Sequence, residues 1–376
     1  LKEQGIDLQV YTLHGAYPGQ TGALSPFGLD SIPIRRRCLG SMVTGLFFMV
    51  RHMGKALDLM GLIGRHCWNK PGMLIKSLFL LPHILVLFQA LKKDRPDVVH
   101  LFWGHYPALL GFLVQKHMPN VVLSHFLGAY DLEQRFPVSA IVADKADVLW
   151  THIQANVPVI ESTGISVGKA QVVYRGAKIE GTQEGDFDKT PQLILAAGRL
   201  LEHKAFPDVL QVVAEVRKRF PEVRLVVCGD GPEKENLKRI ARELGIEEST
   251  VFAGYIPQNE VFAYMERAPV FLHMSLTDWA PNVVKEAAIR GCVCVVVNSL
   301  GMEELIPNDR HGFVVPPHGI DEAISAVLKV FENPEECRQL SAKSRAHVME
   351  FFDVDKNMAK YIDTWAKLMP PSPPAS

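Results

Sequence analysis

Short apolar runs that alternate with amphipathic helical segments constrain the fold of this chain more than any other feature of its sequence. In the second half, 193–197 predicts a buried strand, 208–220 a helix with valines on one side, and 223–228 the next strand. A second helix is predicted over 233–244 and is ended by Gly245. Further apolar runs predict strands at 251–253, 270–273, 292–297 and 313–315. Strands that alternate with helices favour a parallel sheet with helices on both faces.

The same alternation occurs earlier in the chain. Strands are predicted at 7–13, 96–102, 120–126, 147–150 and 170–174, and a helix at 108–117. Residues 177–191 are polar, contain glycine and lack a period, which is typical of a linker. With 376 residues the chain exceeds what one hydrophobic core usually serves. The sequence therefore predicts an α/β protein with two tandem Rossmann-like, doubly wound domains and a ligand cleft between their strand ends.

The expected domain limits follow from this alternation. We expect an N-terminal domain over 1–178, a C-terminal domain over 189–350, a closing helical stretch over 351–369 and a disordered, proline-rich tail over 370–376. The first five residues are typical of a helix end capped by Gly5, and no initiator Met is present. We therefore expect a strand and its loop to be missing before Leu1.

Composition excludes several classes of protein. The six cysteines include no CxxC pair, which fits a reducing cytosol without a disulfide framework or zinc site. Residues 31–95 carry eleven Lys and Arg against two acids, a net charge of +9, within strongly apolar helical runs. This combination indicates a basic helical insert that lies on an anionic membrane surface, although a helical subdomain with a basic exposed face fits the same pattern. No aromatic and basic platform for nucleic acid accompanies the charge.

One stretch, 275–291, combines two acids with a predicted helix start. Asp278 lies in the loop, Pro281 fits the first turn of a helix, and Glu286 lies one turn inside it. Asn282, Glu286 and Arg290 share a helix face at four-residue spacing. A ligand held at this helix start is one interpretation, since N–H groups and the helix dipole favour an anion there. A solvated helix with a Glu286–Arg290 ion pair is the other.

Two further loops follow predicted strands. Arg199 and Lys204 come directly after the strand at 193–197, so that they could clamp a diphosphate or be a pair of exposed cations. Gly229 and Gly231 follow the strand at 223–228 and open a helix, where they could let a nucleotide approach the backbone. A lone Gly-x-Gly is a weak signal.

These motifs together resemble glycosyltransferase family 4, whose members are retaining enzymes with the B-type glycosyltransferase (GT-B) fold. The resemblance covers nearly all of 193–350, from Gly198-Arg199 and Lys204 through Gly229-Asp-Gly-Pro232 to the stretch from Asp278 to Glu286. In the first half, 96–100, 128–132 and 172–176 resemble the exopolysaccharide and lipopolysaccharide branch more loosely.

The resemblance implies a role for each matching residue in the C-terminal domain. Arg199 and Lys204 would neutralise the leaving diphosphate of a nucleotide-sugar donor, and Glu286 would accept hydrogen bonds from the ribose. Asp278 would contact the transferred sugar, at a position where the family usually has Glu. N–H groups around the donor-binding residues Ala280, Pro281, Asn282 and Val283 would face the sugar and the phosphate.

The N-terminal domain would bind the acceptor, and the closing helix over 351–369 would cross back onto this domain. His125 or Asp131 would take the place of the histidine that family members often hold beside the transferred sugar; each also fits polar packing at a strand end. His100, His105 and His125 do not specify a metal site, and no metal and no cofactor is expected.

We therefore expect metal-independent, retaining transfer of a hexose from a nucleotide diphosphate sugar to a glycan or lipid-linked acceptor, in polysaccharide biosynthesis. The expected location is cytoplasmic, peripheral on the cytoplasmic membrane face. A nucleotide-sugar epimerase on the same fold, and a non-catalytic nucleotide-sugar-binding component of a polysaccharide assembly complex, are the alternatives.

Overall fold

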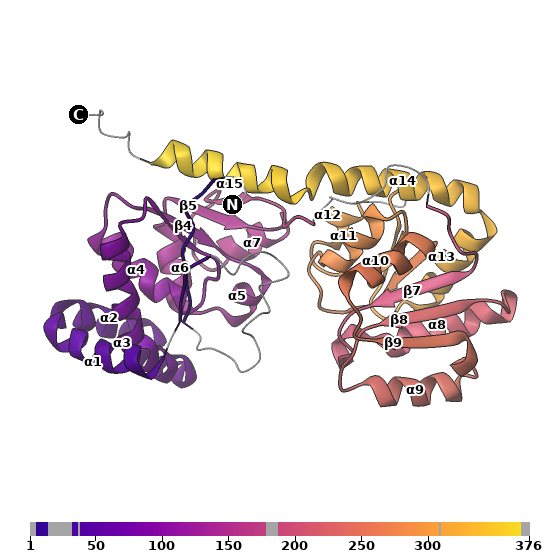
Figure 1. Ribbon diagram of the computed structural model, residues 1–376, viewed down its shortest axis with the longest axis horizontal. Helices are drawn as coiled ribbons and strands as arrows, with labels where there is room; N and C mark the ends of the chain where they lie inside the picture. The colour runs from indigo at the N-terminus through magenta and orange to yellow at the C-terminus, as the bar shows by residue number, and fades with distance from the viewer. Residues whose placement is uncertain (1–4, 14–31, 37, 178–186, 308–309, 370–376) are drawn as a thin grey trace. The chain divides into compact units, whose positions relative to one another are not determined.

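The computed structural model describes residues 5–13, 32–36, 38–177, 187–307 and 310–369 (Figure 1). The chain forms two compact α/β units. Unit 1 comprises 1–152, 156–173 and 358–376, and unit 2 comprises 153–155 and 174–357.

Unit 2 is built on a six-stranded parallel sheet in the order β12-β11-β10-β7-β8-β9. Its strands are β7 (Leu193–Ala197), β8 (Arg224–Cys228), β9 (Thr250–Gly254), β10 (Val270–His273), β11 (Val293–Val297) and β12 (Phe313–Val315). Its helices are α8 (Phe206–Arg219), α9 (Lys234–Glu243), α10 (Gln258–Arg267), α11 (Asn282–Ile289), α12 (Met302–Leu305), α13 (Ile320–Glu332) and α14 (Pro334–Phe351), with short 3₁₀ turns at Glu202–Lys204 and Glu247–Ser249.

Alternation along each strand of unit 2 divides the core between the two faces of the sheet. Ile194 and Leu225 pack with α8, α9 and α13, whereas Leu195 and Phe271 pack with α10, α11 and α14. The strand order reverses between β7 and β10, which are hydrogen-bonded neighbours. In an open parallel sheet such a reversal opens a crevice at the carboxyl ends of the strands, where ligands bind.

Unit 1 contains a four-stranded parallel sheet in the order β3-β4-β5-β6. Its strands are β3 (Val98–Leu101), β4 (Val122–Phe126), β5 (Val148–Thr151) and β6 (Ala170–Val172). Its helices are α1 (Leu39–Arg51), α2 (Met53–Cys67), α3 (Pro71–Asp94), α4 (Pro107–His117), α5 (Ala129–Gln134), α6 (Pro137–Asp144), α7 (Asn156–Glu161) and, from Met358 onward, α15 (Val354–Leu368).

The serine hydroxyl in the middle of β4 ties α15 to the sheet of unit 1. The indole N–H groups of Trp150 and Trp365 donate to Ser124 Oγ at 2.8 and 2.9 Å, and His100 Nδ1 lies 2.8 Å from the same oxygen. A hydroxyl accepts at most two hydrogen bonds and donates one. Ser124 therefore donates to His100, whose imidazole is neutral; burial lowers the pKa of His100 to about 4.

The structure differs from the sequence-based expectation at several places. The strand expected over 7–13 is reduced to β1 (Val10–Tyr11), which pairs with β2 (Ile34–Arg35) and not with the four-stranded sheet. The basic segment 31–95 begins with this β2 before its three helices. Residues 1–4, 178–186 of the expected linker, and the expected tail 370–376 lie outside the described residues.

The division between the units also falls earlier than the expected limit at residue 178. Residues 174–177 belong to unit 2, because the Tyr174 ring lies 4.6 Å from the Phe352 ring and the Ala177 N–H donates to the Phe352 carbonyl at 2.9 Å. Residues 153–155 also belong to unit 2, because the N–H groups of Gln154 and Ala155 donate to the Glu304 carboxylate at 2.7 and 2.8 Å.

Candidate functional site

The loops after the neighbouring strands β7 and β10 meet through an ion pair. Lys204 Nζ lies 2.5 and 2.6 Å from the two carboxylate oxygens of Asp278. The two side chains are 14% and 20% exposed, so the pair is shielded from water but still accessible. The structure thus brings together two residues that the sequence separates by 74 positions.

His273 is the third member of this cluster, and it is not among the site residues that the motifs predict. It is the last residue of β10, and its Nε2 lies 2.9 Å from Asp278 Oδ2. Burial raises the pKa of the Asp278 carboxyl, but the hydrogen bonds and charges of His273 and Lys204 outweigh burial and hold this pKa well below its ordinary value. Asp278 is therefore a carboxylate at neutral pH. The detectable signal was a polar residue at the carboxyl end of a predicted strand.

The segment between Asp278 and α11 has an unusual backbone. Ala280 is buried with φ +44°, a left-handed conformation that residues with a Cβ rarely adopt. Pro281 is the N-cap of α11, and the helix begins at Asn282. The first N–H groups of a helix have no partner inside it, so those at Asn282 and Val283 are available to an anion. Strain of this kind occurs at functional sites.

Glu286 lies one turn inside α11 and is half-buried. Its Oε1 accepts a hydrogen bond from Gln258 Nε2 at 3.0 Å, and burial raises the pKa of its carboxyl. The structure does not contain the solvated Glu286–Arg290 ion pair, because Arg290 is buried. The Arg290 guanidinium lies 3.4 Å from the centre of the Phe262 ring, and its Nη1 donates to the backbone carbonyl of Glu286. The Glu286 carboxylate therefore retains capacity to accept hydrogen bonds from a ligand.

Lys285 was not expected to be buried, yet it is only 1% exposed. Its Nζ donates to the Arg175 carbonyl at 2.7 Å and lies 5.1 Å from the centre of the Phe352 ring. Burial lowers the pKa of Lys285 to about 7. In this geometry Lys285 holds the chain at Arg175 against α11, at the residue next to Glu286.

The glycines after β8 have a packing role in addition to any contact with a ligand. A Cβ at Gly229 would lie 1.8 Å from the Gly198 carbonyl oxygen, and one at Gly231 would lie 2.4 Å from the Leu200 carbonyl oxygen. The loops after β7 and β8 therefore lie directly against each other. Arg199, in the first of these loops, is exposed.

His125 lies in the core of unit 1. It is part of β4, its side chain is fully buried, and neither of its ring nitrogens has a hydrogen-bond partner among the described residues. Burial lowers the pKa of His125 to about 3, so the ring is neutral. The structure thus shows His125 as a buried residue of the sheet, and its expected catalytic role stays a prediction.

Asp131 is also buried, and its carboxylate joins two loops of unit 1. Oδ1 accepts from the N–H groups of Gly104 and His105 at 2.8 and 3.2 Å, and Oδ2 accepts from that of Gly128 at 3.0 Å. Burial raises the pKa of Asp131 to about 6, against the opposing effect of these three donors. These contacts account for Asp131 as a structural acceptor, so its expected catalytic role stays a prediction.

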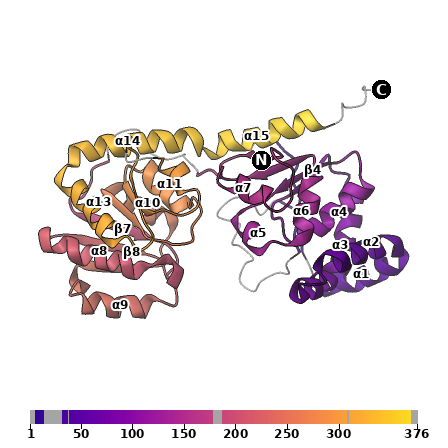
Figure 2. The same ribbon diagram turned by 180° about the vertical axis from the view of Figure 1, so that it is seen from behind.

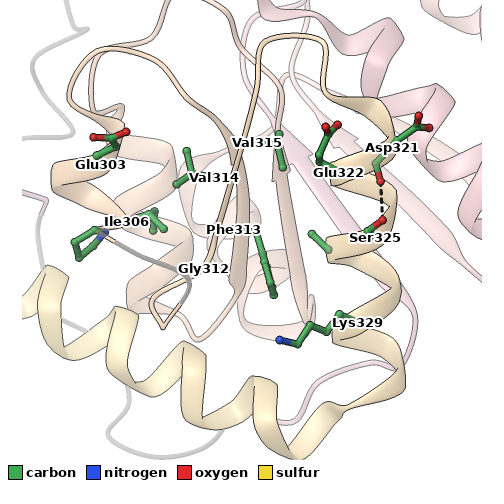
Figure 3. Close-up of a pocket in the computed structure, with 12 residues that line it drawn as sticks. Glu303, Ile306, Gly312, Phe313, Val314, Val315, Asp321, Glu322, Ser325 and Lys329 are labelled. Atoms are coloured by element: carbon green, nitrogen blue, oxygen red, sulfur yellow. Dashed lines mark hydrogen bonds between the residues drawn. The ribbon is translucent and has the colours of Figure 1, made fainter.

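A separate hollow of about 620 Å³ lies beside β12, the edge strand of the sheet in unit 2 (Figure 3). Figure 3 shows Glu303, Asp321 and Glu322 toward one end of it and Lys329 toward the other. None of the residues expected to bind a donor lines this hollow. In the part of the chain that the structure describes, no group of three or more His, Cys, Asp or Glu gathers as a metal site. Metal independence stays a prediction.

Comparison with known proteins finds glycosyltransferases among the proteins that this chain resembles. Residues 178–347 match the family model "Glycosyl transferases group 1". An uncharacterized glycosyltransferase of Haemophilus influenzae is 28% identical over 299 residues, which cover 78% of this chain and 76% of the relative. The N-acetylgalactosamine-N,N'-diacetylbacillosaminyl-diphospho-undecaprenol 4-alpha-N-acetylgalactosaminyltransferase of Campylobacter jejuni is 23% identical over 61% of this chain and 64% of its own length, just under two thirds.

Solved structures support the same fold. The crystal structure of Anabaena HepE in complex with UDP has a TM-score of 0.66 and 17% sequence identity, and covers 76% of this chain and 82% of that one. The expectation of an α/β fold with two Rossmann-like parts of the GT-B type is thereby confirmed. The family model covers 178–347, just under half of the chain, and the matches do not favour the epimerase or the non-catalytic alternative.

Proposed function

We propose that this chain is a retaining glycosyltransferase that moves a hexose from a nucleotide diphosphate sugar to a glycan or lipid-linked acceptor without a metal. In this reaction the bond from the sugar C1 to the diphosphate breaks, a bond from C1 to an acceptor oxygen forms, and the acceptor hydroxyl releases its proton. The observation that carries the proposal is the Lys204–Asp278–His273 cluster beside the start of α11, at the strand reversal of unit 2.

The diphosphate would lie between two cations and a helix start. Lys204 is held by Asp278 and is 14% exposed, and Arg199 is exposed in the same loop. A diphosphate would draw Lys204 from Asp278 as the leaving group gains charge, while the first N–H groups of α11 contribute partial positive charge. These groups would replace the charge that a metal ion supplies in other transferases.

The sugar and the ribose would be recognised by separate carboxylates. Asp278 is ionised and, once Lys204 turns to the diphosphate, can accept hydrogen bonds from hydroxyls of the hexose, while His273 fixes the orientation of its second oxygen. Glu286, which keeps acceptor capacity beside Gln258, would bind the ribose hydroxyls.

The acceptor is proposed from the nature of the relatives. The name of the Campylobacter jejuni relative describes transfer to a diphospho-undecaprenol glycolipid, which supports a lipid-linked acceptor and a function in polysaccharide biosynthesis. The HepE crystal structure contains UDP, which supports a uridine nucleotide as one of the donors to test.

An assay of sugar transfer with UDP- and GDP-sugars tests this proposal. We expect turnover with at least one donor in the presence of EDTA, retention of the anomeric configuration in the product, and a loss of activity of about 100-fold or more in Lys204→Ala and Glu286→Ala. Lys218→Ala is the matched control, because Lys218 forms a surface ion pair with Glu215 on α8. Full activity in both site variants would show that the donor site is assigned wrongly, and conversion of the donor without acceptor would indicate an epimerase.

A further inference from the structure

The outward side of α1 in unit 1 is apolar, which is the reverse of an ordinary surface helix. Val43, Leu46, Phe47 and Val50 recur at i, i+3, i+4 and i+7 and are 61%, 57%, 64% and 75% exposed. Surface helices normally place polar residues at such positions. These four side chains form a continuous apolar stripe, called here the α1 stripe.

The inward side of α1 is fixed against α3, so the α1 stripe has one orientation. At the crossing of the two helices, a Cβ at Gly45 would lie 2.2 Å from the Pro82 carbonyl oxygen. Only glycine permits this approach, and no rotation of α1 could bury the stripe without separating the two backbones. Figures 1 and 2 show α1, α2 and α3 together on the side of unit 1 that is opposite α15.

Neighbouring helices extend the apolar surface. Met53, Leu57 and Trp68 of the α2 region and Ile75 and Leu78 of α3 are each at least 43% exposed. Ten of the twenty-two exposed large apolar residues found among the described residues lie between Val43 and Phe79. Such a concentration of exposed apolar side chains on three packed helices indicates an interaction site, because soluble proteins rarely expose large apolar patches.

The charges on these helices indicate which partner fits. Both acids of α1–α3 are already paired, Asp58 with Lys116 at 2.7 Å and Asp94 with Arg35 at 3.0 Å. Among the described residues, six cations of the three helices form no ion pair with a carboxylate: Arg51, Lys55, Arg65, Lys76, Lys92 and Lys93. The partner should therefore be apolar in part and carry negative charge.

The surface of an anionic bilayer satisfies both conditions. A second copy of the chain and a membrane-spanning α3 are the two alternatives, and neither fits. A second copy of this chain would place two positively charged surfaces against each other. A transmembrane arrangement of α3 is disfavoured, because α3 is long and apolar enough to span but 56% of its apolar window is buried, and its second half packs into the core of unit 1. A surface that combines apolar and basic side chains is typical of proteins that lie in the membrane interface.

We propose that the α1 stripe, with the adjoining parts of α2 and α3, binds the surface of an anionic lipid bilayer. The stripe would enter the boundary between headgroups and acyl chains, and the unpaired cations would contact headgroup phosphates. This inference concerns unit 1 alone and does not depend on the donor site in unit 2.

Co-sedimentation of the full chain with lipid vesicles tests the proposal. We expect binding to vesicles with 30% phosphatidylglycerol at low salt, weaker binding to pure phosphatidylcholine, and a decrease as salt is raised. Val50→Asp should weaken binding about tenfold or more, since it removes one inserted side chain and adds a negative charge. Arg51→Ala should weaken it about fivefold.

The matched control is Val167→Asp, the same substitution at an 85% exposed valine of unit 1 that lies between α7 and β6, outside α1, α2 and α3. We expect this variant to bind vesicles as the wild type does, and both aspartate variants to keep the wild-type circular dichroism spectrum. No binding to anionic vesicles at low salt, or equal binding by the two variants, would overturn the proposal. A lipid-free oligomer that Val50→Asp dissociates would also overturn it, in favour of a second copy of the chain.

Discussion

Replacement of Glu286 by Gln tests the division of labour within the candidate donor site. The change keeps size and shape but turns one acceptor oxygen into an NH₂ donor and removes the negative charge. If both carboxylate oxygens bind ribose hydroxyls, the variant loses one charge-assisted hydrogen bond of about 1.5–3 kcal/mol. At 1.4 kcal/mol for each factor of ten, the dissociation constant of the nucleotide should rise about 10- to 100-fold.

Isothermal titration with UDP, GDP and ADP measures this effect. Because burial raises the pKa of Glu286, wild-type affinity should fall as the pH drops through that pKa, whereas Glu286→Gln should lack this part of the pH dependence. Gln258→Leu is the control, since it removes the hydrogen bond of Gln258 to Glu286 and leaves the carboxylate in place. Equal nucleotide affinity and equal pH dependence in wild type and Glu286→Gln would refute the assignment of the ribose to this residue.

Three further predictions follow from the same geometry. Lys285→Met removes a buried charge together with the hydrogen bond of Nζ to the Arg175 carbonyl, so it should change how the free energy of unfolding, measured by urea denaturation, depends on pH. The pKa of Lys285 is about 7 in the folded chain, below its value in the unfolded chain, so between pH 7 and about 10 the unfolded chain binds more protons. The free energy of unfolding of the wild type should therefore rise with pH in this range, and the variant should not show this rise. Gly229→Ala should lower the free energy of unfolding by about 3 kcal/mol in the same assay. Gly61→Ala is the control and should be neutral or slightly stabilising, because a Cβ at Gly61 would have no atom within 4 Å. Equal effects of the two changes would contradict the close packing of the loops after β7 and β8. Arg199→Ala should weaken UDP binding about tenfold and leave UMP binding nearly unchanged, and an equal loss for both would argue against a diphosphate contact.

The strands of unit 2 were predictable because the period of their apolar residues is strong. The expected strands at 193–197, 270–273 and 313–315 coincide with β7, β10 and β12, since each is a short, mostly apolar run with glycine or proline directly beside it. The beginning of unit 1 was less predictable. The segment 7–13 has the composition of a strand, but only two of its residues pair, and they pair with a β2 that the sequence did not indicate.

The candidate site was predictable only in part, because sequence spacing gives no contacts across the sheet. The loop positions of Lys204 and Asp278 followed from their strands, but their ion pair depends on β7 and β10 being neighbours. The burial of Lys285 is a tertiary effect that helix periodicity did not reveal. His125 shows the same limit in the opposite direction: the sequence places it near a predicted strand end but does not reveal that its side chain is fully buried.

Hydrogen exchange in the presence of a nucleoside diphosphate tests the central claim most directly, because it locates the ligand without an acceptor or turnover. With saturating UDP, or GDP if that nucleotide binds, we predict protection confined to peptides that contain 198–204, 229–231 and 278–286 of unit 2. Protection that instead appears around Glu303, Phe313 and Lys329, at the hollow beside β12, would contradict the proposed donor site.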